Sequence, residues 1–136
     1  MKREINTHKT NGCNDELLIT AADQPGSGGA NHRYEICGFH SGGNPSEDEF
    51  RGFKQGKIKQ VILFQNGPVS EDEAPNGVTN EALLAILIDR MEGFQSGQFA
   101  CNENQIALDH LRGALVAMHS RTKDRLDRGV EGKLEE

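Results

Sequence analysis

The stretch NEALLAILIDRMEGFQSGQFACNENQIALDHLRGALVAMHSRTKDRLDRGVEG, residues 80–132, decides the fold. Its first part is apolar almost all round as far as about Phe94, and Thr79 just before it is a suitable helix N-cap. Two glycines in GFQSGQFAC, residues 93–101, then interrupt the helical pattern. The stretch therefore predicts a buried helix that ends at a glycine-rich bend.

A second helix is expected after the bend. Asn102 is its expected N-cap, and Gln105 stands three residues later, as in a capping box. The helical pattern continues to about Arg128, where Gly129 provides a C-terminal stop. Because the connection is short, we expect the two helices to form an antiparallel hairpin.

Three upstream segments have the composition of β-strands, and polar, glycine-rich connectors separate them. They are ELLIT (residues 16–20), HRYEICGF (residues 32–39) and KQVILFQ (residues 59–65). The connectors, including a long loop at residues 41–57, are too short or too polar for crossover helices, so the sheet should be antiparallel. The prediction is an α+β fold in a single domain, residues 1–136, with a sheet at about 16–68 and a helical hairpin at about 78–129.

The chain has 136 residues, a length typical of one domain, and a formal net charge of −6 at pH 7. Such an acidic chain argues against binding to polymeric nucleic acid or to an anionic membrane. Its longest apolar run, residues 82–88, is far shorter than the ~20 residues that cross a bilayer. Three cysteines without metal-type spacing suit a reducing cytoplasm.

The first helix predicts an oligomer. Leucine, isoleucine and methionine side chains occupy nearly all of its faces. A helix that is apolar on every side must be buried on every side. Because one small sheet cannot cover all of these faces, we expect a homodimer that forms through the helices.

The second helix carries arginines at the end of an apolar stripe. The stripe has spacings of three and four and comprises Leu108, Leu111, Leu115 and Met118, continued by Thr122 and Arg125. Arg121 lies one turn before Arg125, and Arg128 follows three residues after it. These arginines are either solvated beyond the core or face an anion, and their spacing suits two neighbouring phosphate groups.

The bend carries two phenylalanines, Phe94 and Phe99, which either plug the hairpin or offer a platform on which a base stacks. In the second interpretation, the nearby amide of Asn104 reads a base edge. A single hairpin separates the bend from Arg121 by about 25–40 Å. An antiparallel dimer removes this separation, because it places the bend of one subunit beside the arginines of its partner.

The hairpin resembles the helical domain of two families of phage anti-defence sponges. Its most specific parts are FQSGQFACNEN (residues 94–104) and RTKDRLDRGVEG (residues 121–132), within a resemblance that spans about residues 76–132. One family is the anti-Thoeris sponges, which sequester glycocyclic ADP-ribose signals, and the other is the anti-CBASS sponges, which sequester cyclic oligonucleotides. The upstream HRYEICGF and VILFQNGPVSEDEAPNG look more like the anti-Thoeris members, which carry an antiparallel sheet before the two helices.

The resemblance implies a binding protein that is not an enzyme and that needs no cofactor. It implies that Phe94 stacks on adenine and that Asn104 contacts the base. It also implies that Arg121 and Arg125 hold the phosphates and the base. Thr122 and Arg128 are further candidates, because they share the same stripe. The implied assembly is a homodimer, with a hexamer as the alternative, in the cytoplasm of the infected bacterial host.

Three rival functions stay open. The ligand is instead a cyclic di- or trinucleotide of CBASS, alone or at a second site; the chain hydrolyses the signal; or it is a structural phage protein. Hydrolysis has little support, because the histidines have no metal-type spacing and are expected at the surface: His32, His40, His110 and His119. No metal site is predicted.

Overall fold

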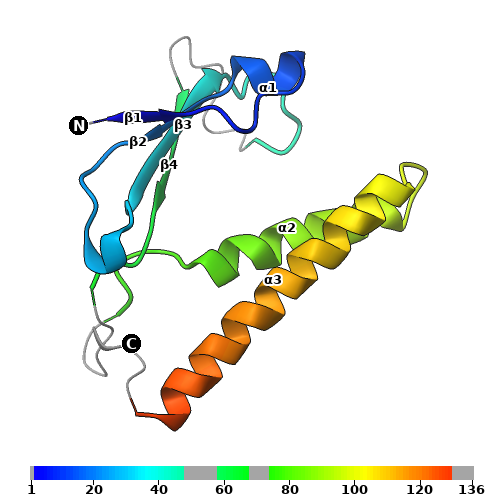
Figure 1. Cartoon of the computed structure of the whole chain (residues 1–136). Coiled ribbons are helices and arrows are strands. Elements are labelled where there is room, and N and C mark those ends of the chain that lie inside the picture. Colours follow the sequence, from blue (N-terminus) through cyan, green and yellow to red (C-terminus); the bar gives the residue numbers. More distant parts are fainter. Residues whose placement is uncertain (1, 48–57, 68–73, 130–136) are drawn as a thin grey trace. The chain divides into compact units, whose positions relative to one another are not determined.

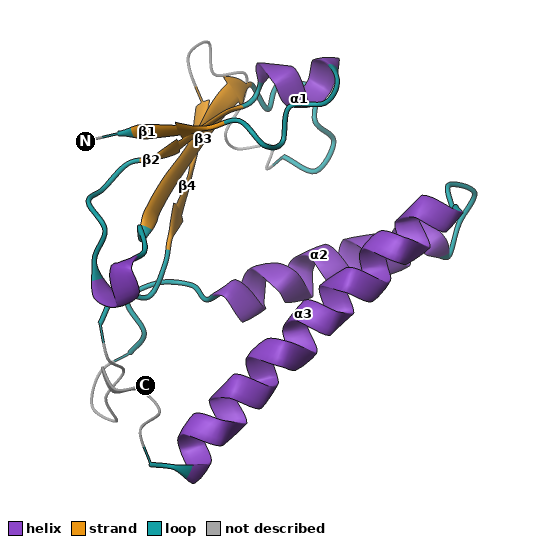
Figure 2. Cartoon of the chain, in the orientation of Figure 1, coloured by secondary structure: helices purple, strands orange, loops and turns teal. Residues whose placement is uncertain are grey.

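The computed structural model describes residues 2–47, 58–67 and 74–129. The chain divides into two compact units, Met1–Leu63 and Phe64–Glu136. The first is built on a β-sheet and the second is a helical hairpin (Figures 1 and 2). The predicted α+β fold, an antiparallel sheet followed by two helices, is confirmed.

The sheet of the first unit has four antiparallel strands that pair in chain order. They are β1 (Arg3–Ile5), β2 (Leu18–Ala21), β3 (Arg33–Phe39) and β4 (Ile58–Leu63). The three predicted strands correspond to β2, β3 and β4, with ends that differ by at most two residues. β1 was not predicted, because it has three residues and a single apolar side chain, too little for a period-two pattern.

Two short helical segments connect these strands. The helix α1 (Gly12–Glu16) precedes β2, and the 3-10 turn η1 (Ser27–Gly29) lies in the predicted turn before β3. Of the predicted loop at residues 41–57, residues 41–47 form turns, and the remainder lies outside the described residues. Among the described residues, no helix is long and apolar enough to cross a membrane.

Gly38 explains an irregularity in β3. The pairing of β3 with β4 shifts register between Ile36 and Phe39, and Gly38 between them has φ of 89°. A side chain at this position would also collide with the backbone carbonyl of Glu16. Only glycine meets both demands, so the glycine that interrupts the strand pattern is a requirement of the packing.

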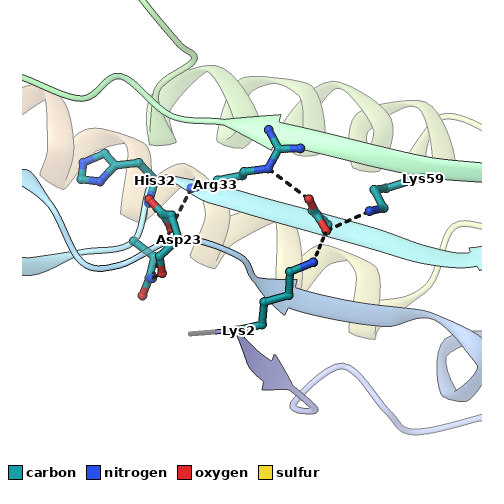
Figure 3. Close-up of polar contacts among 7 residues, drawn as sticks. Lys2, Asp23, His32, Arg33 and Lys59 are labelled. Atoms are coloured by element: carbon teal, nitrogen blue, oxygen red, sulfur yellow. Dashed lines mark hydrogen bonds and ion pairs between the residues drawn. The ribbon is translucent and has the colours of Figure 1, made fainter.

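The sheet buries a carboxylate within a cluster of cations (Figure 3). Glu35 on β3 is 9% exposed, and its two oxygens lie 3.0 Å from Arg33 Nε, 3.1 Å from Lys59 Nζ and 3.6 Å from Lys2 Nζ. Hydrogen bonds from Lys59 and then from Arg33 lower the pKa of Glu35, and burial opposes them with a smaller effect. The cluster therefore favours an ionised Glu35 and links β3 to β4 and to Lys2, the residue before β1.

Asp23 anchors the start of β3. Its carboxylate accepts hydrogen bonds from the backbone N–H groups of His32 (3.1 Å) and Arg33 (3.2 Å) and from Nδ2 of Asn31 (3.2 Å) (Figure 3). Burial is the largest single influence on the pKa of Asp23 and raises it, but these hydrogen bonds together outweigh it and lower the pKa.

The prediction that His32 lies at the surface was wrong, because His32 is only 7% exposed. The hydrogen bond from its backbone N–H to the Asp23 carboxylate fixes His32 just before β3, and the ring is buried there. Among the described residues, no partner hydrogen-bonds to its Nδ1. A pattern of strand and turn residues does not predict such a hydrogen bond between a side chain and a distant backbone group.

The second unit contains the two long helices, α2 (Asn80–Gln95) and α3 (Asn102–Asp127). The predicted N-cap of α2 is confirmed, since Thr79 Oγ1 accepts a hydrogen bond from Ala82 N at 3.1 Å. The predicted stop after α3 is also confirmed, because Gly129 follows the helix with φ of 73°.

The predicted cap of α3 was wrong by one residue. Cys101 is the N-cap, and its Sγ accepts a weak hydrogen bond from Asn104 N at 3.4 Å, so Asn102 is already helical. Gln105 does not close a capping box, because its side chain is engaged with Gln95 and Asp109. Cysteine is an unusual N-cap, and the general preference for asparagine pointed to its neighbour.

Candidate ligand-binding site

The side chain of Gln95 locks the bend between the helices. Its Oε1 accepts a hydrogen bond from Cys101 N at 3.0 Å, and its Nε2 donates to Gln105 Oε1 at 3.2 Å. Gln105 Nε2 in turn donates to Asp109 Oδ1 at 2.9 Å. The last turn of α2 and the first turn of α3 are therefore held at the same level, which gives the residues around the bend a fixed position.

Two predicted site residues lie at this locked bend. Phe94 is in the last turn of α2 and is 41% exposed. Asn104 is in the first turn of α3 and is half-buried, and its Nδ2 donates to the Phe99 carbonyl at 3.2 Å. The side chain of Phe99 is 67% exposed, so it does not plug the hairpin. The backbone of Phe99 thus orients Asn104, while the ring of Phe94 is partly open to solvent.

Arg90 covers part of the Phe94 ring, a contact that the sequence reasoning missed. The guanidinium carbon lies 5.6 Å from the ring centroid, within the range of a cation–π interaction. Arg90 stands four residues before Phe94, which places both on one stripe of α2. This spacing of four residues in the sequence would have predicted the contact.

The predicted stripe of α3 is its buried face. Leu108 is 2% exposed, the following stripe residues are half-buried, and Arg125 at its end is only 5% exposed. Thr122, one position along the stripe before Arg125, is half-buried too. The stripe therefore keeps its inward direction past its last apolar residue, and Arg125 points inward, where it is engaged in an interaction within the chain.

The other two arginines do not share this burial. Arg121 and Arg128 are both exposed. Arg128 Nε donates to Asp124 Oδ2 at 3.0 Å, and Arg128 is also the C-cap residue of α3. Arg121 is thus an exposed arginine next to the stripe, whereas Arg128 contributes to the end of the helix.

An ion pair identifies the two sides of the hairpin. On both helices the inward-facing residues are spaced three or four positions apart. On α2 they are Leu84, Ile88, Met91 and Gln95. Glu92 follows Ile88 by four positions, and Arg112 follows Leu108 by four. Their side chains form an ion pair of 3.2 Å, as expected for equivalent positions on one side of two antiparallel helices.

The opposite side of the hairpin carries residues that come immediately before inward-facing ones. Phe94 precedes Gln95, and Arg121 precedes Thr122. Both therefore lie on the side away from the Glu92–Arg112 pair. We call this side the Phe94 flank; by the same rule its residues include Leu87, Arg90, Phe94, Ala107, Ala114 and Arg121.

Along the hairpin, Phe94 and Arg121 are far apart. Gln95 is level with Gln105, because their side chains are hydrogen-bonded. The 16 residues from Gln105 to Arg121 correspond to about 24 Å of helix. Within one chain, Phe94 and Arg121 therefore share a face without sharing a site.

The middle of the Phe94 flank is apolar and small. Leu87 is 46% exposed and lies about midway between Phe94 and Arg121, near the level of Ala114. Ile86 beside it is 57% exposed, whereas Ile88 on the inner face is 9% exposed. One chain thus buries only one side of the apolar helix α2.

The chain thus combines a small antiparallel sheet with a helical hairpin that has Phe94 near its bend and arginines in the last turns of α3. Residues 56–123, half of the chain, match the family model described as Acb2/Tad1, hairpin domain. The chain belongs to this family.

A phage protein is similar to the chain over a larger part of its length. The protein named Thoeris anti-defense 1, from Bacillus phage SBSphiJ7, is 44% identical over 94 residues, which is 69% of this chain. The matched part covers 64% of that relative's own length.

Proposed function

We propose that the chain binds a cyclic ADP-ribose-type immune signal, glycocyclic ADP-ribose, and sequesters it without cleaving it, so that the Thoeris effector is not activated. The signal is a small-molecule nucleotide, and the expected place of action is the cytoplasm of the infected host. The likeness to a protein named Thoeris anti-defense 1 supports action against Thoeris, and the resemblance of the hairpin to the anti-Thoeris sponges supports the choice of ligand.

The position of Phe94 and Arg121 on one flank is the observation that carries the proposal. Such an arrangement is incomplete in one chain, because the levels of Phe94 and Arg121 are about 24 Å apart along the hairpin. A two-fold axis near Leu87 and Ala114 would bring Phe94 of each subunit level with Arg121 of the other. The proposed assembly is therefore a homodimer with two equivalent sites.

Each proposed site has a complete set of groups for an adenine nucleotide. Phe94 stacks on the base, and Asn104 offers an amide oxygen that accepts no hydrogen bond from the described residues. Arg121 of the other subunit is exposed and holds a phosphate, with Thr122 beside it. Arg125, one turn further on, is 5% exposed and engaged within its own chain, so its guanidinium has to turn toward the ligand to hold the second phosphate. Arg128 is a weaker candidate, because it is paired with Asp124.

The exposed apolar side chains support association of the helices. Leu87 and Ile86 leave apolar surface on α2 that a second copy would cover. Alanines at two positions of the flank, Ala107 and Ala114, allow close approach of a partner helix. Assembly of dimers into a hexamer is the alternative state.

Sequestration acts by mass action, so the protein must bind tightly and be abundant relative to the signal. The test is mass spectrometry of the small molecules released by denaturing protein that has been exposed to an activated Thoeris lysate. The expected result is the intact cyclic signal. A linear product that accumulates with time would instead identify a hydrolase.

A cyclic di- or trinucleotide is the second candidate ligand, because the hairpin also resembles that of the anti-CBASS sponges. Its base and phosphates offer the same chemistry to Phe94 and the arginines. Titrating the protein with glycocyclic ADP-ribose and with cyclic di- and trinucleotides separates the two. Tighter binding of a cyclic oligonucleotide would replace the first candidate.

A further inference from the structure

Arg90 is a cation beside Phe94 that the proposed site leaves without a role. It is exposed, and its guanidinium lies over the ring of Phe94 at 5.6 Å from the centroid. Within the described residues it makes no ion pair. The nearby carboxylate of Glu92 is paired with Arg112 on the other side of the hairpin.

The surroundings of Arg90 are apolar. One turn before it stand Ile86 and Leu87, which are 57% and 46% exposed, and one turn after it stand Gly93 and Phe94. In a single chain the guanidinium of Arg90 is still exposed to water. In the proposed dimer a second copy covers Leu87, and the guanidinium of Arg90 loses part of that water.

A partly desolvated cation needs an anion, because an unpaired buried charge is costly. The ring of Phe94 also restricts where that anion can lie, since Arg90 already occupies one face of the ring. A base that stacks on Phe94 therefore takes the open face, and its attached phosphates can reach the guanidinium around the ring edge.

From this arrangement we propose that Arg90 is a ligand-binding residue, a third arginine that contacts a phosphate of the nucleotide stacked on Phe94 of the same subunit. The inference rests on the proposed function. It adds a phosphate contact on the subunit that supplies the aromatic ring, whereas Arg121 and Arg125 come from the other subunit.

The test compares three variants by calorimetric titration with glycocyclic ADP-ribose. Arg90→Gln removes the charge and should raise Kd about tenfold or more, as expected for loss of a charged hydrogen bond. Arg90→Lys keeps the charge but loses the planar fork of donors, so its Kd should lie between those of the unmodified protein and of Arg90→Gln. Lys123→Gln makes the same charge change at an exposed position on α3, outside the flank, and should leave Kd unchanged.

The outcomes separate the inference from the proposed function. If Arg90→Gln binds as tightly as the unmodified protein while Phe94→Ala binds weakly, Arg90 has no role in the site and the proposed function stands. If Arg90→Gln and Lys123→Gln raise Kd equally, the loss reflects the overall charge of the hairpin and not a contact with the ligand, and the inference is overturned. If the unmodified protein does not bind this ligand at all, the proposed function fails first.

Discussion

The carboxylate of Glu92 on α2 lies 3.2 Å from the guanidinium of Arg112 on α3. This ion pair fixes which side of each helix faces the same direction, and it places Phe94 and Arg121 together on the other side. The pair itself is half-exposed and contributes little to stability. Its importance is geometric, because it shows that an aromatic and a cation at opposite ends of the hairpin belong to one surface.

Replacing Phe94 should weaken ligand binding. Phe94→Ala removes the proposed stacking platform and should cost about 1–3 kcal/mol of binding free energy, the usual value for one base. Isothermal titration calorimetry with glycocyclic ADP-ribose measures this change. Phe99→Ala is the matched control, since Phe99 is in the same bend but contributes its backbone carbonyl to Asn104. Equal affinities for Phe94→Ala and the unmodified protein would remove Phe94 from the site.

Arg121 and Arg125 should differ in their effect on stability. Arg121 is exposed, so Arg121→Ala should weaken binding and leave the melting temperature nearly unchanged. Arg125 is 5% exposed, so Arg125→Ala should also lower the stability of the hairpin, by about 1–3 kcal/mol.

Thermal unfolding followed by far-ultraviolet circular dichroism measures this difference, with Lys123→Ala as the control for loss of an exposed cation. In infected cells, loss of both arginines should abolish protection of the phage from Thoeris. Unchanged protection by the double variant would instead favour a structural role for the protein.

A charge in the middle of the Phe94 flank should prevent dimerisation. Leu87→Asp introduces a carboxylate near the proposed two-fold axis without touching the inward-facing residues of α2. Light scattering after size-exclusion chromatography should then report a monomer. Val116→Asp is the matched control, because Val116 is 65% exposed on another side of α3. A dimer that survives Leu87→Asp and dissociates with Val116→Asp would place the interface elsewhere.

The sheet should lose stability in acid through Glu35. Its pKa in the folded protein is lowered from an ordinary value of 4.5, so its contribution is present above that value and is lost as the pH falls through the folded pKa. Glu35→Gln should therefore destabilise the sheet near neutral pH, and the difference from the unmodified protein should be smaller in acid, below the ordinary pKa of 4.5.

The fluorescence of Tyr34 can follow this unfolding, because it is the only tyrosine, the chain has no tryptophan, and Tyr34 lies on β3. Glu4→Gln is the control, since Glu4 is 56% exposed and its ion pair with Lys9 is long, at 3.9 Å. A Glu35→Gln effect that is the same at both pH values would mean that packing, rather than charge, is the contribution of Glu35.

The sequence predicted the hairpin well because its signals are local. The cap at Thr79, the glycine bend and the stop at Gly129 each depend on a few neighbouring residues, and all three are present in the structure. The short strand β1 and the burial of His32 were missed, since they depend on partners that are distant in the sequence. Propensity alone also favoured Asn102 over Cys101 as the helix cap.

The candidate site was predictable only in part. The spacing of Arg121, Thr122 and Arg125 indicated a shared stripe, but not that Arg125 is buried while Arg121 is exposed. Which side of α2 faces the same way as Arg121 depends on the pairing of the helices, and that became visible through Glu92 and Arg112. Sequence spacing on a single helix carries no such information.

The most direct measurement asks whether one site uses two chains. Phe94→Ala and Arg121→Ala subunits carrying different affinity tags are co-expressed, and the mixed dimer is purified through both tags and titrated with glycocyclic ADP-ribose. Sites shared between chains predict one tight site per mixed dimer, because one pocket keeps both residues and the other loses both. A mixed dimer with no tight site, like the two parent variants, would contradict a pocket built from two subunits.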